Sequence, residues 1–319
     1  MLKAVRFSDF LKEDIPAVPS LMGDGIIVPE GRVIIYGDPG TYKSFATLQL
    51  CYALENGSEW LGYEIEKNCR VMYLQAELIP KRMQERGQRM EDYYGEGELT
   101  YTYTRDFTLS TTDEWEALTN LVEENKAEFI FLDPMSQLLS GSEIDDGLMR
   151  RFFKGLDIMT TVTGAGVGLV HHSRKSISDG NGGVRYSGAS DLRGHSTIHA
   201  WADSIVRLSR NGIPGIIEAD WQKTRHRPEL DSRWLKFDDN CGILRIAETD
   251  PKKMLYETLR DGPRRREEVD KVLKKEAGLS PRKSGVYRKE MESKGFIEQY
   301  QDPINKKYKL VRLRNDGKD

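Results

Sequence analysis

The sequence predicts an α/β fold in which a mainly parallel sheet carries helices on both faces, with a small helical domain after it. Three observations predict this fold. Short apolar runs alternate with helical patterns over residues 1–248, as buried parallel strands and their crossover helices do. Polar side chains follow several of these runs at their carboxyl ends, where sheets of this class bind ligands. From Pro251 onward, three helix patterns precede two short strands.

The composition limits the class of protein. The chain has 319 residues, enough for one large domain and a smaller one. No apolar run approaches the roughly 20 residues of a membrane-spanning helix, and the amino terminus lacks the pattern of a signal peptide. Three scattered cysteines form no metal-binding spacing. We therefore expect a soluble, cytoplasmic protein with no membrane partner and no zinc.

An apolar run over residues 33–36 leads into a glycine-rich loop, and a helix pattern from Phe45 to Glu55 follows at once. Backbone N–H groups of such a loop cradle phosphates, its lysine neutralises the β- and γ-phosphates, and its hydroxyl reaches Mg²⁺. The sequence thus predicts a site for ATP and Mg²⁺, against the alternatives of a coincidental turn or a decayed site. The residues of the loop are Gly37, Asp38, Pro39, Gly40, Thr41, Tyr42, Lys43 and Ser44.

Tyr42 departs from the usual motif, which has glycine immediately before the lysine. A bulky residue is strained at positive φ, so we expect the backbone of Tyr42 to lie at negative φ. The substitution puts full hydrolytic competence in doubt.

The elements that follow the loop alternate as a parallel sheet requires. Expected strands lie at 70–77, 128–133 and 164–172, and expected helices begin at Pro80 or cover 111–125 and 147–160. The remaining strands are expected at 203–208, 213–221, 234–237 and 243–246.

Candidate catalytic residues stand at the ends of three of these strands. Hydrolysis of a phosphoanhydride needs placed charges and an oriented water. Asp133 is the candidate that binds Mg²⁺ together with Ser44, directly or through water. Glu77 is the candidate that polarises the attacking water, and its alternative role is to stabilise the start of the next helix. His171 or His172 could contact the γ-phosphate and report its loss, or could simply be packed.

Residues 251–319 predict a second domain. Helix patterns at 252–260, 265–276 and 280–294 precede a β-hairpin at 296–300 and 307–313, which is the order of a winged helix-turn-helix. Its third helix would present Arg282, Lys283, Tyr287 and Arg288 to DNA. The alternative is a winged helix that contacts protein.

The charge is distributed unevenly between the two domains. From Pro251 to the end the chain has 20 Lys and Arg against 12 Asp and Glu, whereas the rest has 28 against 39. A basic end on an acidic body indicates contact with an anion such as DNA, and the alternative is a solvated basic surface.

The ordered motifs resemble those of the RecA-like ATPases of the RepA and DnaB helicase type. The motifs are GDPGTYKS, VMYLQAEL, IFLDP and LVHHSRK, and the resemblance continues through Asp191 to Asp203. In that family a Lys-x-Arg pair reaches the γ-phosphate of the neighbouring subunit. Lys223 and Arg225 match this pair, and Arg227 is a second candidate for the arginine.

The resemblance implies a RecA-like P-loop core, a homo-hexameric ring with ATP between neighbours, and single-stranded DNA in the channel. The Gly- and Ser-rich segment 173–190 would face that channel, and the alternative for this segment is disorder. Residues 139–146 are a second candidate to face the channel. The winged helix could guide duplex DNA or contact replication proteins. The residues of segment 173–190 expected to contact DNA are Arg174, Lys175, Arg185 and Tyr186.

The implied activity is that of an ATP-dependent DNA helicase or translocase motor of replication. One alternative is a RecA/RadA-like DNA-binding ATPase or a helicase loader that does not unwind DNA. A third hypothesis is an ATP-gated DNA-binding regulator.

Overall fold

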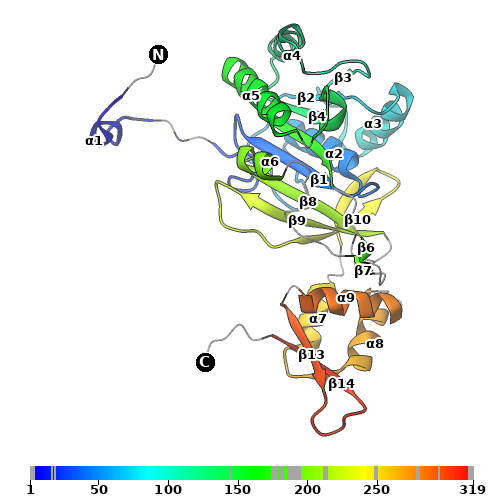
Figure 1. Ribbon diagram of the computed structural model, residues 1–319. Helices are drawn as coiled ribbons and strands as arrows, with labels where there is room; N and C mark the ends of the chain where they lie inside the picture. The colour runs from blue at the N-terminus through cyan, green and yellow to red at the C-terminus, as the bar shows by residue number, and fades with distance from the viewer. Residues whose placement is uncertain are drawn as a thin grey trace.

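The computed structural model shows a large sheet-containing core joined to a smaller carboxyl-terminal unit (Figure 1). The residues that the structure describes are 4–15, 17, 19–143, 145–173, 178–179, 183–184, 195–210, 215–247, 251–277, 281–293 and 295–314.

A nine-stranded sheet forms the centre of the core, and its strand order is β11-β10-β9-β8-β1-β5-β4-β2-β3. The six strands from β8 to β3 in this order are parallel, and the other three continue the sheet in antiparallel fashion. The parallel strands are β1 (Arg32–Gly37), β2 (Val71–Gln75), β3 (Thr100–Tyr103), β4 (Phe129–Asp133), β5 (Gly166–His172) and β8 (Ser204–Arg210). The others are β9 (Ile216–Thr224), β10 (Arg233–Asp238) and β11 (Ile243–Ile246). The predicted fold class is confirmed.

Helices cover both faces of the sheet. Side chains of a strand alternate between faces, so Val33 and Ile35 of β1 lie in one apolar core and Ile34 and Tyr36 in the other. The first core also contains residues of α2 (Lys43–Asn56) and α3 (Pro80–Tyr94). The second contains residues of η1 (Met135–Leu138), α4 (Thr112–Glu124), α5 (Asp146–Thr163) and α6 (His195–Trp201).

Strand β3 and helix α6 are not among the elements expected from the sequence. The Thr-Tyr-Thr-Tyr segment of β3 forms an edge strand and lacks the continuous apolar run of a central one. Helix α6 lies inside the segment expected to lead directly into the next strand. Other expected elements of the core are present within a few residues of their expected bounds.

The carboxyl-terminal unit contains three helices and a three-stranded antiparallel sheet of order β12-β14-β13. Its elements are α7 (Pro251–Leu259), β12 (Arg264–Arg265), α8 (Arg266–Ala277), α9 (Pro281–Ser293), β13 (Ile297–Gln301) and β14 (Lys309–Leu313). Trp234 of β10 belongs to the apolar core of this unit, and its ring meets that of Tyr287 edge-on with centroids 5.9 Å apart.

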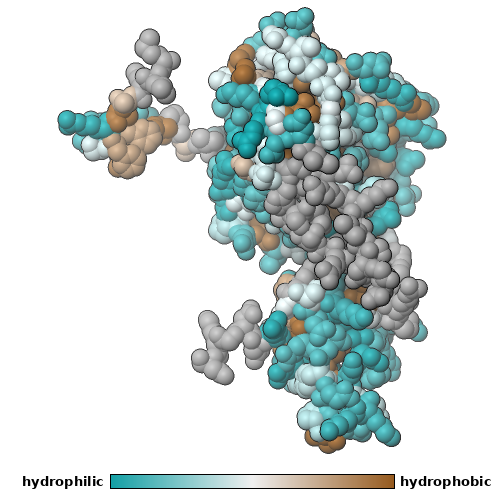
Figure 2. Space-filling model, viewed as in Figure 1, coloured by the Kyte–Doolittle hydropathy of each residue, from teal (hydrophilic) through white to brown (hydrophobic). Residues whose placement is uncertain are grey.

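The amino-terminal arm projects from the core and carries α1 (Phe7–Phe10) (Figure 1). No residue of α1 is buried, and Figure 2 shows apolar side chains gathered there. A short hairpin of β6 (Ser178–Asp179) and β7 (Gly183–Val184) follows β5. Among the described residues, no helix is long and apolar enough to cross a membrane.

Candidate nucleotide-binding site

The phosphate-binding loop leaves β1 at the centre of the sheet, between β5 and β8. A Cβ atom on Gly37 would lie 2.0 Å from the carbonyl oxygen of Leu208, so only glycine fits this close approach of two strands. Gly40 has φ of 74° and turns the loop back toward α2. The glycines therefore set the path that leads Lys43 and Ser44 into the first turn of α2.

Lys43 is buried beneath the loop with its side chain 5 % exposed. Its ammonium group donates a hydrogen bond to the carbonyl oxygen of Asp38 at 2.8 Å. Burial lowers the pKa of Lys43 to about 8, against the opposing charges of Asp133, Asp38 and Glu77. The ammonium is thus a desolvated cation whose nearest neighbours are anions or a carbonyl, and a triphosphate would bind it strongly.

Tyr42 has φ of 62°, so the expectation of a negative φ is wrong. Its ring stacks on that of Phe237 in β10 with centroids 4.1 Å apart, and Phe45 meets Phe237 edge-on at 4.9 Å. A left-handed conformation costs a non-glycine residue about 1–3 kcal/mol, and an aromatic pair contributes about 0.5–1.5 kcal/mol. The stacking therefore offsets much of the strain, and Tyr42 can adopt the left-handed conformation that glycine adopts readily.

Asp133 ends β4 and is 1 % exposed. Burial raises the pKa of this carboxyl group, and hydrogen bonds from the hydroxyl groups of Tyr73 and Ser44 oppose that effect. A carboxylate beside a serine hydroxyl is a hard oxygen pair of the kind that Mg²⁺ accepts when phosphates supply further ligands. No cluster of three His, Cys, Asp or Glu side chains in the described part of the chain could hold a metal by itself. The two residues thus fit a metal that arrives with a nucleotide.

Glu77 lies two residues beyond the end of β2 and is exposed. The side-chain oxygen of Gln75 accepts hydrogen bonds from the backbone N–H groups of Glu77 at 2.5 Å and Leu78 at 3.0 Å. This turn holds Glu77 at the same edge as Asp133 and Lys43, whose pKa values its charge affects.

The two histidines at the end of β5 lie on opposite faces of the sheet. His171 is 1 % exposed, and its Nδ1 lies 3.5 Å from Oε1 of Glu143, which is also buried. His172 is half-buried and pairs in register with Gly37. Ser173 then donates hydrogen bonds from its hydroxyl to the Asp38 carboxylate and from its backbone N–H to Gly37 at 3.1 Å. The end of β5 is thus tied to the phosphate-binding loop.

Two arginines that the sequence analysis missed also lie at this edge. Arg210, at the end of β8, donates to the carbonyl oxygen of Gly40 from Nη2 at 2.6 Å and from Nε at 3.2 Å. Arg86 of α3 lies 4.2 Å above the ring of Phe45. Burial lowers the pKa of Arg86, and the charges of Tyr73, Asp133 and Glu77 oppose this effect. Arg210 follows a predicted strand and could have been found by that signal. For Arg86, nothing in the local sequence marks the position.

Lys223 and Arg225 lie at the opposite edge of the sheet. Strand β9 runs antiparallel to β8, so Thr224 pairs with Ser204 at the start of β8, whereas Leu208 pairs with Gly37 at the start of the loop. The structure therefore separates this pair of cations from the Lys43 site of the same chain. Arg227 lies on the same flank and donates to the carbonyl oxygen of Gly23.

Six of the expected DNA-contacting side chains lie outside the described part of the structure. Arg174, Lys175, Arg185 and Tyr186 lie outside the described residues. Arg282 and Lys283 belong to α9, but their side chains are outside the described part of the structure.

The expectation that Arg288 contacts DNA is wrong. Arg288 is 5 % exposed, and its Nε and Nη2 donate to the two carboxylate oxygens of Asp270 at 2.7 and 3.0 Å. Its Nη1 donates to Gln299. Ser284, Tyr287 and Met291 are also buried, so these residues form the inner face of α9 at the spacing of a helix. Tyr287 is therefore a core residue as well.

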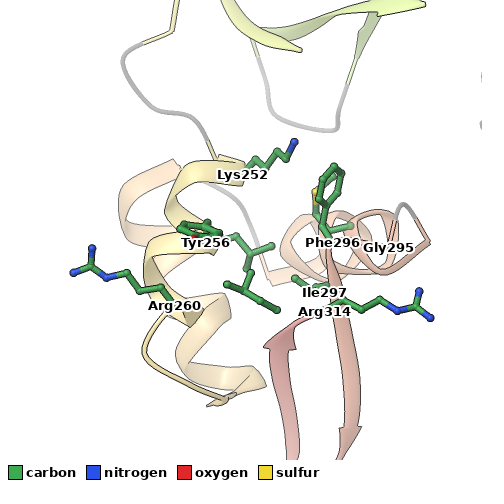
Figure 3. A pocket seen from close by; sticks show the side chains of 10 residues that line it. Lys252, Tyr256, Arg260, Gly295, Phe296, Ile297 and Arg314 are labelled. Carbon is green, nitrogen blue, oxygen red and sulfur yellow. The ribbon is translucent and has the colours of Figure 1, made fainter. Parts of the chain in front are cut away.

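A separate pocket of about 510 Å³ lies between α7 and the start of β13 (Figure 3). Phe296 lines it, with the ammonium of Lys252 3.9 Å from the centroid of its ring. Arg260 and Arg314 line its sides and point away from each other. The basic character of the carboxyl-terminal unit thus extends to this pocket.

The chain is similar to a known protein family and to solved structures. A family model described as an AAA domain matches residues 1–177. The structure is similar to the ATPase domain of G40P, with a TM-score of 0.53 and 14% identity over 69% of this chain and 85% of that one. It is also similar to the KaiC-like protein PH0186 from Pyrococcus horikoshii OT3, with a TM-score of 0.48 and 13% identity over 69% and 90% of the two chains. Among curated proteins, none matched the sequence.

Proposed function

The chain belongs to the AAA domain family and has a RecA-like P-loop core, and on this basis we propose that it is a DNA-stimulated ATPase that acts as a helicase or translocase motor of replication. The observation that carries the proposal is the convergence of Lys43, Ser44, Asp133 and Glu77 at one edge of the sheet. These residues supply a cation, a metal-binding pair and a carboxylate for water, which are the parts that phosphoryl transfer needs.

Each residue at this edge has a distinct role. Lys43 exchanges its hydrogen bond to the Asp38 carbonyl for the β- and γ-phosphates, and the backbone N–H groups of the loop surround them. Ser44 and Asp133 would hold Mg²⁺, which would neutralise charge on the phosphates. Glu77 accepts a hydrogen bond from the attacking water and orients it, because its turn is fixed by Gln75.

We further propose that a neighbouring subunit completes the site in a homo-hexameric ring. Arg225 and Lys223 are remote from the Lys43 site of their own chain. An arginine supplied by a neighbour would stabilise the charge that develops on the γ-phosphate. Contact between the P-loop edge of one copy and the opposite edge of the next is a head-to-tail arrangement, which closes into a ring when the rotation permits.

DNA is the proposed substrate of the motor. Arg174, Lys175, Arg185 and Tyr186 would hold single-stranded DNA in the channel by backbone charge and stacking. The contacts of Ser173 with Asp38 and Gly37 support a link between this segment and the phosphate-binding loop. His171 and His172 remain candidates to sense the γ-phosphate. We propose that Arg282 and Lys283 of a winged-helix unit contact duplex DNA or a replication partner, and that the protein acts in the cytoplasm.

The test compares Glu77→Gln with Glu85→Gln, a change on the exposed face of α3. Glu77→Gln should retain binding of Mg²⁺-ATP in calorimetry and lose hydrolysis by about 10²–10⁴-fold, because water activation is lost. Glu85→Gln should behave as the wild type, since Glu85 pairs with the exposed Arg82 and an exposed ion pair contributes little. Unwinding of a forked DNA by the wild type, lost in Glu77→Gln, would support the motor.

Other outcomes would favour the other functions. DNA-stimulated hydrolysis without strand separation would indicate a RecA/RadA-like DNA-binding ATPase or a helicase loader. Site-specific duplex binding that survives Lys43→Ala would indicate an ATP-gated regulator. A monomer without affinity for Mg²⁺-ATP would contradict all three.

A further inference from the structure

The side chain of Arg225 is held in place although it is 43% exposed. Its Nη1 lies 2.8 Å from Oδ1 of Asp203. Its Nη2 donates to the carbonyl oxygen of Ala200, in the last turn of α6, at 3.1 Å. An exposed arginine normally samples many rotamers, whereas this guanidinium has partners on two of its nitrogen atoms.

Asp203 is itself fixed by the backbone. Its Oδ2 accepts a hydrogen bond from the N–H of Arg32 at 3.0 Å, and its own N–H donates to the carbonyl oxygen of Arg32 at 2.8 Å. Its carbonyl oxygen accepts from the N–H of Arg225 at 2.9 Å. The carboxylate therefore cannot rotate away without breaking contacts to the first residue of β1, and it presents Oδ1 to Arg225 in one direction.

Lys223 shares this arrangement. Its ammonium donates to the carbonyl oxygens of His199 and Ala202 at 2.6 Å each, at the carboxyl end of α6. The pKa of Lys223 is lowered by burial and by the charge of Arg225, and it is raised by Asp203. Lys223 and Arg225 repel each other, and they stay together because the Asp203 carboxylate and carbonyl groups at the end of α6 stabilise both charges.

We propose that Asp203 is a positioning residue, which aims Arg225 at the triphosphate bound by the neighbouring subunit. This inference rests on the proposed function. A donor held in place before the reaction needs no reorganisation as charge develops on the γ-phosphate, whereas a free side chain must first be ordered. Asp203 touches neither nucleotide nor water in this role and acts through Arg225.

The decisive variant is Asp203→Asn, which keeps the shape of the side chain and its acceptor for Arg32 but removes the charge. We expect kcat for DNA-stimulated ATP hydrolysis to fall about tenfold or more, with KM for ATP nearly unchanged. The double variant Asp203→Asn with Arg225→Ala should be no slower than Arg225→Ala alone, because both changes remove one interaction.

Asp157→Asn is the matched control on the same flank. Asp157 pairs with Nη2 of Arg32 at 3.1 Å and accepts from the indole of Trp201 at 2.8 Å, whereas Arg225 is held by Asp203 and Ala200. If Asp203 only supported the fold, Asp157→Asn and Asp203→Asn would lower thermal stability and kcat together. We expect similar unfolding temperatures and a loss of kcat in Asp203→Asn alone.

Mixed assemblies provide a second measurement. Subunits with Asp203→Asn keep Glu77, and subunits with Glu77→Gln keep a correctly aimed Arg225. Mixing the two should restore hydrolysis above either variant alone, because sites form in which Glu77 and a positioned Arg225 come from different chains. A defect confined to the variant's own site would show no such restoration and would overturn the inference.

The outcomes distinguish a failure of the positioning role of Asp203 from a failure of the proposed function. Full activity in Asp203→Asn with loss in Arg225→Ala overturns the positioning role and leaves the motor intact. Full activity in Arg225→Ala overturns the proposed action of Arg225 on the neighbour, and Asp203 then has no target. Loss in both variants, restored by mixing, supports both.

Discussion

The two edges of the central sheet hold their basic side chains in different surroundings. At the carboxyl edge, Lys43 lies among Asp38, Glu77 and Asp133, so the edge contains both signs of charge and a loop shaped for phosphate. At the amino edge, Lys223 and Arg225 are fixed to Asp203 and to the end of α6, and no phosphate-binding loop accompanies them in the described part of the chain. In the proposed function, the first edge binds the nucleotide, whereas the second acts on a nucleotide bound by the neighbouring subunit.

We therefore expect the removal of one cation from each edge to affect nucleotide affinity and kcat differently. Arg225→Ala should leave the affinity for Mg²⁺-ATP unchanged and lower kcat about 10³-fold or more, the effect of losing an arginine supplied by a neighbour. Calorimetry and steady-state hydrolysis measure the two quantities. Lys43→Ala should instead abolish binding. If Arg225→Ala weakened binding as much as Lys43→Ala does, the two edges would not divide the work as described.

Titration should also distinguish the edges. The Lys43 ammonium of the free protein loses its proton above a pKa of about 8, and a bound triphosphate favours the charged form. ATP binding should then take up a proton above pH 8, and affinity should fall by up to about tenfold per pH unit. Calorimetry in two buffers of different ionisation enthalpy measures this uptake.

The controls for this titration come from both edges. Lys43→Arg should bind without proton uptake, because a guanidinium does not titrate in this range. Arg225→Ala should keep the uptake of the wild type. Uptake that persisted in Lys43→Arg would show that another group titrates.

The smallest effect concerns the conformation of the P-loop edge. Tyr42→Gly relieves the positive φ but loses the stack on Phe237, so stability should change by no more than about 1 kcal/mol, with hydrolysis retained. Tyr42→Ala keeps the strain without the ring and should be the less stable variant in urea unfolding. The opposite order of the two variants would contradict the account of how the loop tolerates tyrosine.

Much of the carboxyl edge was predictable because its residues follow apolar strands. Gly37 to Ser44, Glu77, Asp133 and His172 all occupy strand ends, and the topology of a parallel sheet brings strand ends together. Local sequence also identified the helices of the carboxyl-terminal unit through their caps and apolar spacing.

The errors arise where a distant residue decides the outcome. The strain of the positive φ of Tyr42 is offset by its stack on Phe237, which approaches only when β10 joins the sheet. Arg288 was assigned to DNA contact because it lies on the third helix of the expected winged helix, but Asp270 and Gln299 satisfy its guanidinium inside the unit. The partners of Arg225 are Asp203, which immediately precedes β8, and Ala200 of α6, a helix that was not predicted.

Trp234 belongs to the large core in sequence but packs in the apolar interior of the carboxyl-terminal unit. Its indole is 3% exposed and completes the apolar interior formed by Leu255, Leu273 and Tyr287, although the residue belongs to a strand of the ATPase sheet. A protein shortened to residues 1–247 would turn this large ring out to water, and the released fragment would be left with a hole where the ring had been. Experiments on either piece alone would then report on damaged surfaces, so the intact polypeptide is the proper material for measuring what each part does.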